Sequence, residues 1–319
     1  MKRDGAEPVA QIALLFSAPS RDWNRNIGFE AGLFGMAQEL EALHIPYEMI
    51  ANISLRPEIL SKYKVLSIGS SACLSDRELE AIKEFARQGG TVLLNTVAGL
   101  CDEAGVERKE WPFREQFGFA PVYYTKWTAT DWDGAHSEKP VRIFLKPGSA
   151  NLLHEERPLG KGRFIYCALD VAGQFAAAEK SANEKWTFTP DKPLEEAYRS
   201  YLKRLLATDA CWEINAPDQL YTAIWKEADG TLAIHFLNAT GAKPQPGEVL
   251  DGLAPKPAFP DLPSDITFRL LAEKATHVTA ASPSFEGKKE LAFVKDADGT
   301  ITVTLPAELA KQYVVVKIK

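Results

Sequence analysis

The 319-residue sequence has few cysteines, no long apolar run and no excess of basic residues. Its 37 Lys and Arg residues are outnumbered by 43 Asp and Glu residues, which argues against the basic face of a nucleic-acid-binding protein. No run approaches the roughly 18 apolar residues of a membrane-spanning helix. The polar residues that interrupt the N-terminal segment are untypical of a signal peptide. We therefore expect a cytoplasmic protein with neither a nucleic-acid nor a membrane partner.

Cysteine and glycine patterns for metals and phosphates are missing as well. The cysteines are far apart in the sequence and form no CxxC pair, at Cys73, Cys101, Cys167 and Cys211. This spacing favours free thiols in a reducing compartment over a zinc site or a disulfide framework. GxGxxG and Walker patterns are absent, and residues 160–162 (GKG) are interpreted as a turn. We therefore expect no cofactor and no metal.

The most informative stretch that is present covers residues 65–99. A short apolar run, a helical segment and a second apolar run follow one another there, which is the pattern of a βαβ unit with parallel strands. Ser75 and Glu78 form a capping box at the start of the helix, and Gly89 and Gly90 end it. The helix has one apolar face, made of Leu79, Ile82, Phe85 and Ala86.

Residues 1–212 alternate between apolar runs and helical patterns, which predicts a first domain with a doubly wound α/β sheet. Apolar runs predict strands at residues 11–17, 47–50, 122–127, 141–144 and 163–169. Helical spacing predicts longer helices at residues 28–44 and 193–207, and short helical segments near residues 57–63 and 111–117. The segments 18–26 and 171–191 are predicted to be loops.

Residues 213–319 have a different composition and no convincing long helix. Short strand patterns separated by Asp-Gly turns predict a small antiparallel β-sandwich domain. The strands are expected at residues 220–225, 231–238, 266–271, 277–281, 291–295, 301–305 and 313–319. Residues 241–265 are rich in proline and are expected to form an irregular connection.

Candidate site residues follow from the rule that open α/β sheets bind ligands beyond the carboxyl ends of their strands. The residues expected there as ligand or subunit contacts are Arg21, Asp22, Trp23, Asn24, Thr96 and Asp170. The segment around Trp23 combines charge, amide and an aromatic ring, so it suits a sugar ring or a neighbouring subunit. The alternative is a solvated loop with one packed tryptophan.

The sequence selects no catalytic residue. Cys73 precedes a helix, a setting that can lower a thiol pKa, but no base is placed beside it and an inert thiol is the alternative. The turn at residues 95–99 has no cysteine and no G-x-S-x-G elbow occurs, so a glutaminase reaction is excluded. No spacing selects a catalytic carboxylate pair from Asp22, Asp102, Glu103, Asp131, Asp133 and Asp170. An aromatic cluster fits either a sugar platform or packing: Tyr123, Tyr124, Trp127 and Trp132.

Three segments carry a family resemblance: ALLFSAPSRDW, LRPEILSKYKVLSIGSSACLSDRELEAIKEFARQGGTVLLN and LHEERPLGKGRFIYCALD. They resemble the trimerisation domain of bacterial β-galactosidases and related glycoside hydrolases. This resemblance implies a flavodoxin-like fold of the class I glutamine amidotransferase type that has lost its nucleophile. The C-terminal part resembles the β-domain that follows it in those enzymes. The LSD…FARQGGTV segment also resembles ThuA-like sugar-utilisation proteins.

The family's catalytic glutamates lie on a TIM barrel, which takes about 250 residues and has no place before the first predicted strand. The chain is therefore expected to correspond to the C-terminal part of a glycoside hydrolase, with no activity of its own. The resemblance implies a non-catalytic assembly or accessory role in carbohydrate metabolism. Its expected partners are further copies of itself in a homo-oligomer (a trimer), a carbohydrate, and a catalytic barrel chain. A stand-alone sugar-processing hydrolase and a carbohydrate-binding module are the alternatives.

Overall fold

The structure is a computed structural model, and it describes residues 5–23, 29–69, 71–95, 98–118, 154–167, 178–180, 186–188, 192–206, 212–239 and 260–319. The chain divides into two compact units. The sandwich unit comprises residues 1–11, 36–48 and 175–319, and the parallel-sheet unit comprises residues 12–35 and 49–174. The predicted domain boundary between residues 212 and 213 stays a prediction.

The parallel-sheet unit is organised around a sheet in the order β3-β2-β4-β5-β7-β6. Its strands are β2 (Ile12–Phe16), β3 (Tyr47–Ala51), β4 (Val65–Gly69), β5 (Thr91–Asn95), β6 (His154–Leu159) and β7 (Gly162–Cys167). The β2–β4, β4–β5 and β5–β7 pairs are parallel, and β6 is antiparallel to β7. The predicted parallel strands of residues 65–99 and the turn at residues 160–162 are therefore confirmed. The predicted strands at 122–127 and 141–144 lie outside the described residues.

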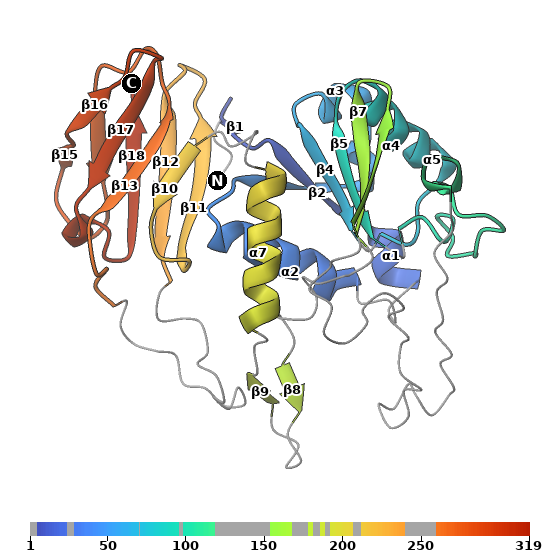
Figure 1. Cartoon of the computed structure of the whole chain (residues 1–319). Coiled ribbons are helices and arrows are strands. Elements are labelled where there is room, and N and C mark those ends of the chain that lie inside the picture. Colours follow the sequence, from blue (N-terminus) through green and yellow to red (C-terminus); the bar gives the residue numbers. More distant parts are fainter. Residues whose placement is uncertain are drawn as a thin grey trace. The chain divides into compact units, whose positions relative to one another are not determined.

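Helices α3 (Pro57–Leu60), α4 (Asp76–Arg87) and α5 (Arg114–Phe117) cover one face of this sheet (Figure 1). Alternate residues of the strands point toward them, so both partners bury their apolar side chains in one core. The sheet contributes Ala13, Leu15, Leu66, Ile68, Val92, Leu94, Phe164 and Tyr166. The helices and the residues just before α5 contribute Leu60, Leu79, Ile82, Phe85, Ala86, Trp111, Phe113 and Phe117.

Helix α4 has the ends that its sequence predicts. Ser75 Oγ accepts the Glu78 N–H at 3.3 Å, and the Glu78 carboxylate accepts the Ser75 N–H at 2.8 Å. The predicted apolar face is buried. At the other end, a Cβ on Gly90 would lie 2.2 Å from the Phe85 ring, so any larger residue would force this ring to shift where the chain turns into β5.

Two predicted loops contain regular structure. Residues Ala18–Trp23 form helix α1, because Ser17 Oγ accepts the Ser20 N–H at 3.2 Å and caps the first turn. Within 171–191, strands β8 (Ala178–Lys180) and β9 (Trp186–Phe188) pair as a hairpin, in keeping with the strand propensity of the sequence Trp-Thr-Phe. The predicted helices at 28–44 and 193–207 are observed as α2 (Phe29–Ala42) and α7 (Lys192–Leu206).

The sandwich unit contains two antiparallel sheets in the orders β1-β11-β12-β18-β14-β15 and β10-β13-β17-β16 (Figure 1). Predicted strands are observed as β11 (Leu220–Lys226), β12 (Leu232–Asn238), β13 (Ile266–Leu271), β14 (Val278–Ala281), β16 (Phe293–Lys295), β17 (Thr300–Leu305) and β18 (Tyr313–Ile318). Strands of the sandwich unit that the sequence analysis missed are β1 (Glu7–Pro8), β10 (Trp212–Asn215) and β15 (Lys288–Glu290). Inward residues of both sheets share one apolar core, which confirms the predicted sandwich architecture.

A buried ion pair joins α7 to the end of α2 within the sandwich unit. The Glu39 side chain is 5% exposed, and its carboxylate lies 2.5 Å from the Arg199 guanidinium. Arg199 also reaches the Asp218 carboxylate at 3.4 Å. A buried carboxylate without a cation is costly, so Arg199 fixes α7 relative to α2.

The turn after α2 is fixed by the sandwich strands. His44 takes a left-handed backbone conformation (φ +56°), and its carbonyl accepts the indole N–H of Trp212 at 2.7 Å. Its imidazole Nε2 lies 3.2 Å from the Ala216 carbonyl oxygen. Burial lowers the pKa of His44 below its usual value of 6.5, although the Ala216 carbonyl and the nearby Asp218 charge oppose that shift.

No helix among the described residues has both the length and the apolar character to cross a membrane.

We predict that the burial of His44 makes the sandwich unit acid-sensitive. The unfolded chain takes up a proton near pH 6.5 and the folded chain only at lower pH, so the free energy of unfolding should fall as pH drops below that value. His44→Asn keeps a residue that tolerates φ > 0 but removes the titration. Urea unfolding at pH 7.5 and pH 5 should show a smaller acid loss in His44→Asn than in the wild type. The exposed His277→Asn is the control and should behave like the wild type.

Candidate functional site

The carboxyl ends of β2, β4 and β5 bring three segments together in the parallel-sheet unit. Helix α1 follows β2, residues 71–75 follow β4, and residues 98–108 form the described part of the connection after β5. Gly99 N–H donates to the Ser71 carbonyl at 2.9 Å, which joins the second and third segments. The predicted convergence of strand-end segments is therefore observed. The predicted contact residues Asn24, Thr96 and Asp170 lie outside the described residues.

Two serines fix helix α1 to the segment after β4. Ser20 Oγ accepts the Cys73 N–H at 2.9 Å, and Ser17 Oγ donates to the Cys73 carbonyl at 3.1 Å. All three residues are completely buried. Since a buried peptide group needs hydrogen-bond partners, these contacts determine where α1 starts and where its last residues lie.

The predicted contact residues Arg21, Asp22 and Trp23 occupy the end of α1. Arg21 Nε donates to the Asp22 carboxylate at 2.7 Å, and the guanidinium lies 5.4 Å from the centre of the Phe16 ring. Both charged side chains are about half exposed, at 44% and 51%. Trp23 is 65% exposed, which is unusual for so large an apolar side chain.

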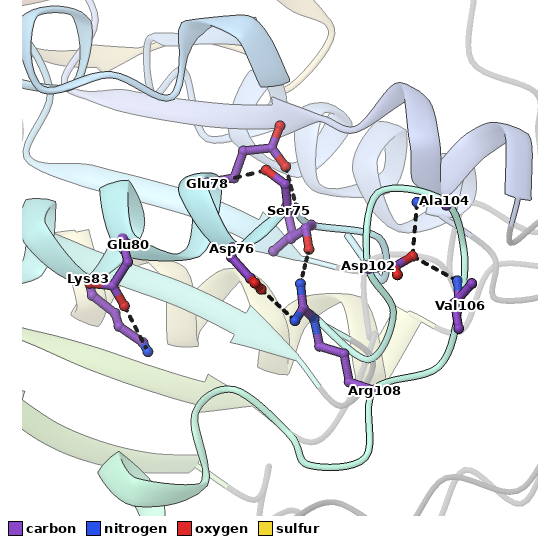
Figure 2. Close-up of polar contacts among 10 residues, drawn as sticks. Ser75, Asp76, Glu78, Glu80, Lys83, Asp102, Ala104, Val106 and Arg108 are labelled. Carbon is purple, nitrogen blue, oxygen red and sulfur yellow. Dashed lines mark hydrogen bonds and ion pairs between the residues drawn. The ribbon is translucent and has the colours of Figure 1, made fainter.

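The segment after β5 is a tight turn built on Asp102. Its carboxylate accepts the N–H groups of Ala104 and Val106, both at 2.9 Å (Figure 2). Gly105 has φ +80°, and a Cβ there would lie 2.7 Å from the Trp23 Cβ. The turn therefore lies against Trp23, and glycine is needed both for the conformation and for the close approach.

Arg108 ties this turn to the start of α4. Its guanidinium donates to the Asp76 carboxylate at 2.6 Å and to the Leu74 carbonyl at 2.7 Å (Figure 2). The Arg108 side chain is 19% exposed, so these charge-assisted bonds are partly shielded from water. The same view shows the Ser75–Glu78 capping box beside it and the Lys83–Glu80 ion pair one turn along α4.

Three exposed apolar side chains extend from the strand ends. Trp23, Ile53 and Val106 are 65%, 76% and 62% exposed. Ile53 belongs to the 3-10 turn η2 (Asn52–Ser54) after β3, and Asn52 Oδ1 accepts the Ala18 N–H of α1 at 3.1 Å. We call Arg21, Asp22, Trp23, Ile53 and Val106 the strand-end surface.

The described carboxylates and the thiol of this region are engaged in local contacts or buried. The Asp22 carboxylate is paired with Arg21, and the Asp102 carboxylate holds its own turn. Cys73 is completely buried, so its thiol does not face a solvent-borne substrate, as the inert-thiol interpretation requires. Among the described residues, no group of three His, Cys, Asp or Glu side chains could hold a metal ion. The predicted aromatic cluster of residues 123–132 lies outside the described part of the chain.

Sequence reasoning missed Ile53, Val106 and Arg108. The Asp102-x-x-Gly105 spacing signals a turn, and this signal could have placed Val106 at its tip. Nothing local marks Ile53, because its exposure depends on how the segment after β3 meets α1. Arg108 is 32 positions from its partner Asp76, which no sequence pattern reveals.

Comparisons with known proteins support the fold. No family model and no curated protein sequence matches the chain. A β-galactosidase from Bacillus circulans sp. alkalophilus is similar with a TM-score of 0.55 at 15% identity, over 98% of this chain and 42% of that one. The α-L-fucosidase isoenzyme 2 from Paenibacillus thiaminolyticus gives a TM-score of 0.55 at 18% identity, over 98% and 49%. A β-galactosidase from Rahnella sp. R3 gives 0.51 at 13% identity, over 94% and 41%.

These similarities show that the chain has a fold found in glycoside hydrolases. The chain spans less than half the length of each of these structures. Because the identities are low, the comparison extends to the fold alone. The resemblance to the trimerisation domain stays a prediction.

We predict that Gly105→Ala destabilises the parallel-sheet unit more than Gly118→Ala does. Both glycines have φ above +70°, but nothing lies within 4 Å of a Cβ at Gly118. The backbone strain alone should lower the free energy of unfolding by about 1 kcal/mol in Gly118→Ala. Gly105→Ala adds the clash with Trp23 to this strain, so it should lower the free energy of unfolding by about 2–3 kcal/mol. Equal losses in urea unfolding would contradict the described contact between Trp23 and the turn.

Proposed function

We propose that the chain is a non-catalytic assembly or accessory part of a glycoside hydrolase-like protein in carbohydrate metabolism. The observation that carries this proposal is the similarity over 98% of the chain to only 42% of a β-galactosidase and 49% of a fucosidase. A fold that recurs as a minor part of larger hydrolases suits a supporting role beside a separate catalytic part, such as a barrel chain.

The finer fold assignment belongs to the same proposal. The order β3-β2-β4-β5-β7 places the strands in chain order 2-1-3-4-5, which is the flavodoxin-like order. A glutamine amidotransferase-like sheet without its nucleophile fits residues 95–99, which contain no cysteine.

We assign subunit contact to the strand-end surface. Its three apolar side chains are more than 60% exposed, and exposed apolar groups beside charged ones are typical of association surfaces. The proposed partner is another copy of the chain in a homo-oligomer, with a trimer favoured by the family resemblance.

Trp23→Ala tests the assembly role. We expect wild-type chain to form a trimer in light scattering across a concentration series. Trp23→Ala should raise the dissociation constant at least about tenfold, because a tryptophan that becomes buried in an interface is a frequent hot spot. Leu271→Ala is the matched control, since Leu271 is 59% exposed on the sandwich unit, and it should leave the mass unchanged. A monomer at every concentration would refute the assembly proposal. An unchanged mass in Trp23→Ala would refute this surface as the contact.

A carbohydrate contact is the second candidate for the same surface. It is favoured by the exposed Trp23 ring next to the Arg21–Asp22 ion pair, because sugars combine apolar ring faces with hydroxyls that bond to charged groups. Titration of the monomeric or oligomeric chain with galacto-oligosaccharides, followed by calorimetry, distinguishes this role. Heat of binding that disappears in Trp23→Ala but persists in Leu271→Ala would favour it.

We expect the chain by itself to give no turnover of nitrophenyl galactosides or fucosides. The reason is that the Asp22 and Asp102 carboxylates already hold their neighbours in place. Turnover that is abolished by Asp22→Asn or Asp170→Asn would contradict this expectation and support a stand-alone hydrolase. Lys83→Gln, on an exposed pair of α4, is the control.

A further inference from the structure

The outer face of the long sandwich sheet carries very little charge. Strands β11, β12 and β18 pair side by side in this sheet (Figure 1). Successive side chains of a strand point to opposite faces, and Ile224, Ile234 and Val316 point into the sandwich core. Each of the three strands therefore has three outward residues, and of these nine only Lys317 is charged. Its ammonium group pairs with the Glu227 carboxylate at 2.8 Å.

The short sheet of the same sandwich has an outer face of the ordinary kind. The outward residues of β13 and β17 are Thr267, Arg269, Leu271, Thr300, Thr302 and Thr304. Five of these six residues are polar, as is expected for an antiparallel sheet that has one face in water. The long sheet departs from this pattern within the same unit, which marks its outer face as an interaction surface.

Large side chains form a row across the outer face of the long sheet. Tyr221 of β11 lies opposite Leu237 of β12, and Leu237 lies opposite Tyr313 of β18. Tyr221 and Leu237 are 38% and 44% exposed. Trp225 lies further along β11 on the same side, and His235 lies on β12 opposite the position between the two β11 aromatics. We call Tyr221, Trp225, His235, Leu237 and Tyr313 the aromatic face.

The two tyrosines bring hydroxyl groups to the aromatic face. The Tyr313 hydroxyl contacts Nδ1 of His235, and the centres of the two rings lie 5.8 Å apart. Burial and the charges of Glu41 and Asp218 raise the pKa of Tyr221, so its hydroxyl stays protonated at neutral pH and can donate a hydrogen bond. The face therefore combines flat apolar rings with polar tips.

The size of the aromatic face suits a small extended ligand. Tyr221 and Tyr313 are two strand spacings apart, or about 10 Å, and Trp225 is four residues from Tyr221 along the strand, or about 13 Å. These spacings define an area on the order of 250 Å², with half a spacing added at each border. A stable protein dimer buries about 800 Å² on each partner, so this face is too small to hold a second folded copy. A peptide that adds as a strand needs a sheet edge, which a sheet face does not offer.

We propose that the aromatic face binds a neutral oligosaccharide, with sugar rings stacked on Tyr221 and Trp225 and sugar hydroxyls bonded to the tyrosine hydroxyl groups. A sugar ring has C–H groups on its faces, which pack on an aromatic ring, and hydroxyls at its rim, which need hydrogen-bond partners. A neutral sugar is favoured because the one charged outward residue, Lys317, is already paired with Glu227. The choice of a sugar rests on the proposed function, whereas the aromatic face belongs to the sandwich unit and shares no residue with the strand-end surface.

Affinity electrophoresis of the full chain in native gels that contain galactan, xylan or mannan tests this proposal. We expect at least one of these neutral polysaccharides to slow the wild type. Tyr221→Ala removes a stacking ring, and Leu237→Lys places a hydrated charge in the middle of the face. Each should raise the dissociation constant for that polysaccharide about tenfold. A wild-type chain that no gel slows would overturn the proposal.

Matched variants separate the aromatic face from other surfaces. Leu271→Lys adds the same charge to the outer face of the short sheet, where Leu271 is 59% exposed, and it should be slowed like the wild type. Because the replaced side chains are all exposed, each variant should unfold in urea like the wild type. Slowing that is lost in Trp23→Ala but kept in Tyr221→Ala would overturn the proposal and assign the sugar to the strand-end surface.

Light scattering keeps this inference distinct from the assembly proposal. Tyr221→Ala and Leu237→Lys should have the subunit mass of the wild type. A lower mass in both variants with unchanged slowing in the gels would show that the face is a subunit contact and would overturn the sugar site. A monomeric wild type that galactan, xylan or mannan still slows through Tyr221 would support this inference while refuting the assembly proposal.

Discussion

The strand ends of the parallel-sheet unit depend on the peptide groups of one buried residue, Cys73. Its N–H and carbonyl have no access to water and must be satisfied within the protein. Ser17 and Ser20 supply these partners from α1. The neighbouring Ala72 and Leu74 peptides pair with Cys101. A single set of main-chain requirements thus fixes three segments that are distant in the sequence.

In the sandwich unit, a buried polar group must likewise find its partner within the protein, and here that group is a charged carboxylate. Glu39 is buried and needs the Arg199 guanidinium, which in turn reaches Asp218 on the connection between β10 and β11. Beside it, the Trp212 indole N–H donates to the His44 carbonyl, and the Ala216 carbonyl lies within hydrogen-bond distance of the His44 Nε2. In both units, apolar burial supplies the cores, while a few buried polar groups decide which peripheral segments stay attached and in what position.

How much could be predicted from the sequence depended on the distance over which each signal acts. Helix α4 was predicted in detail because its cap, its apolar period and its glycine stop all lie within 16 residues (75 to 90). Helix α1 also begins at a capping serine, Ser17. The helix is only six residues long, and its polar sequence is typical of a loop. The strand-end surface was found only in part, because the exposure of Ile53 and Val106 depends on which strand ends meet. The predicted parallel order of strands could place Trp23 near the other strand ends, but it could not predict the ion pair between Arg108 and Asp76.

Strand β1 pairs with β11 through only Glu7 and Pro8, followed by one further bond from the Val9 N–H to the Ile224 carbonyl. Proline has no N–H to offer to an additional strand. At the opposite border of the same sheet, β15 consists of Lys288, Lys289 and Glu290, all exposed. Short, charged or proline-containing borders are how sheets avoid templating the addition of foreign strands. The long sheet of the sandwich is therefore shielded against growth by edge-to-edge aggregation, and association by strand addition at that sheet is disfavoured.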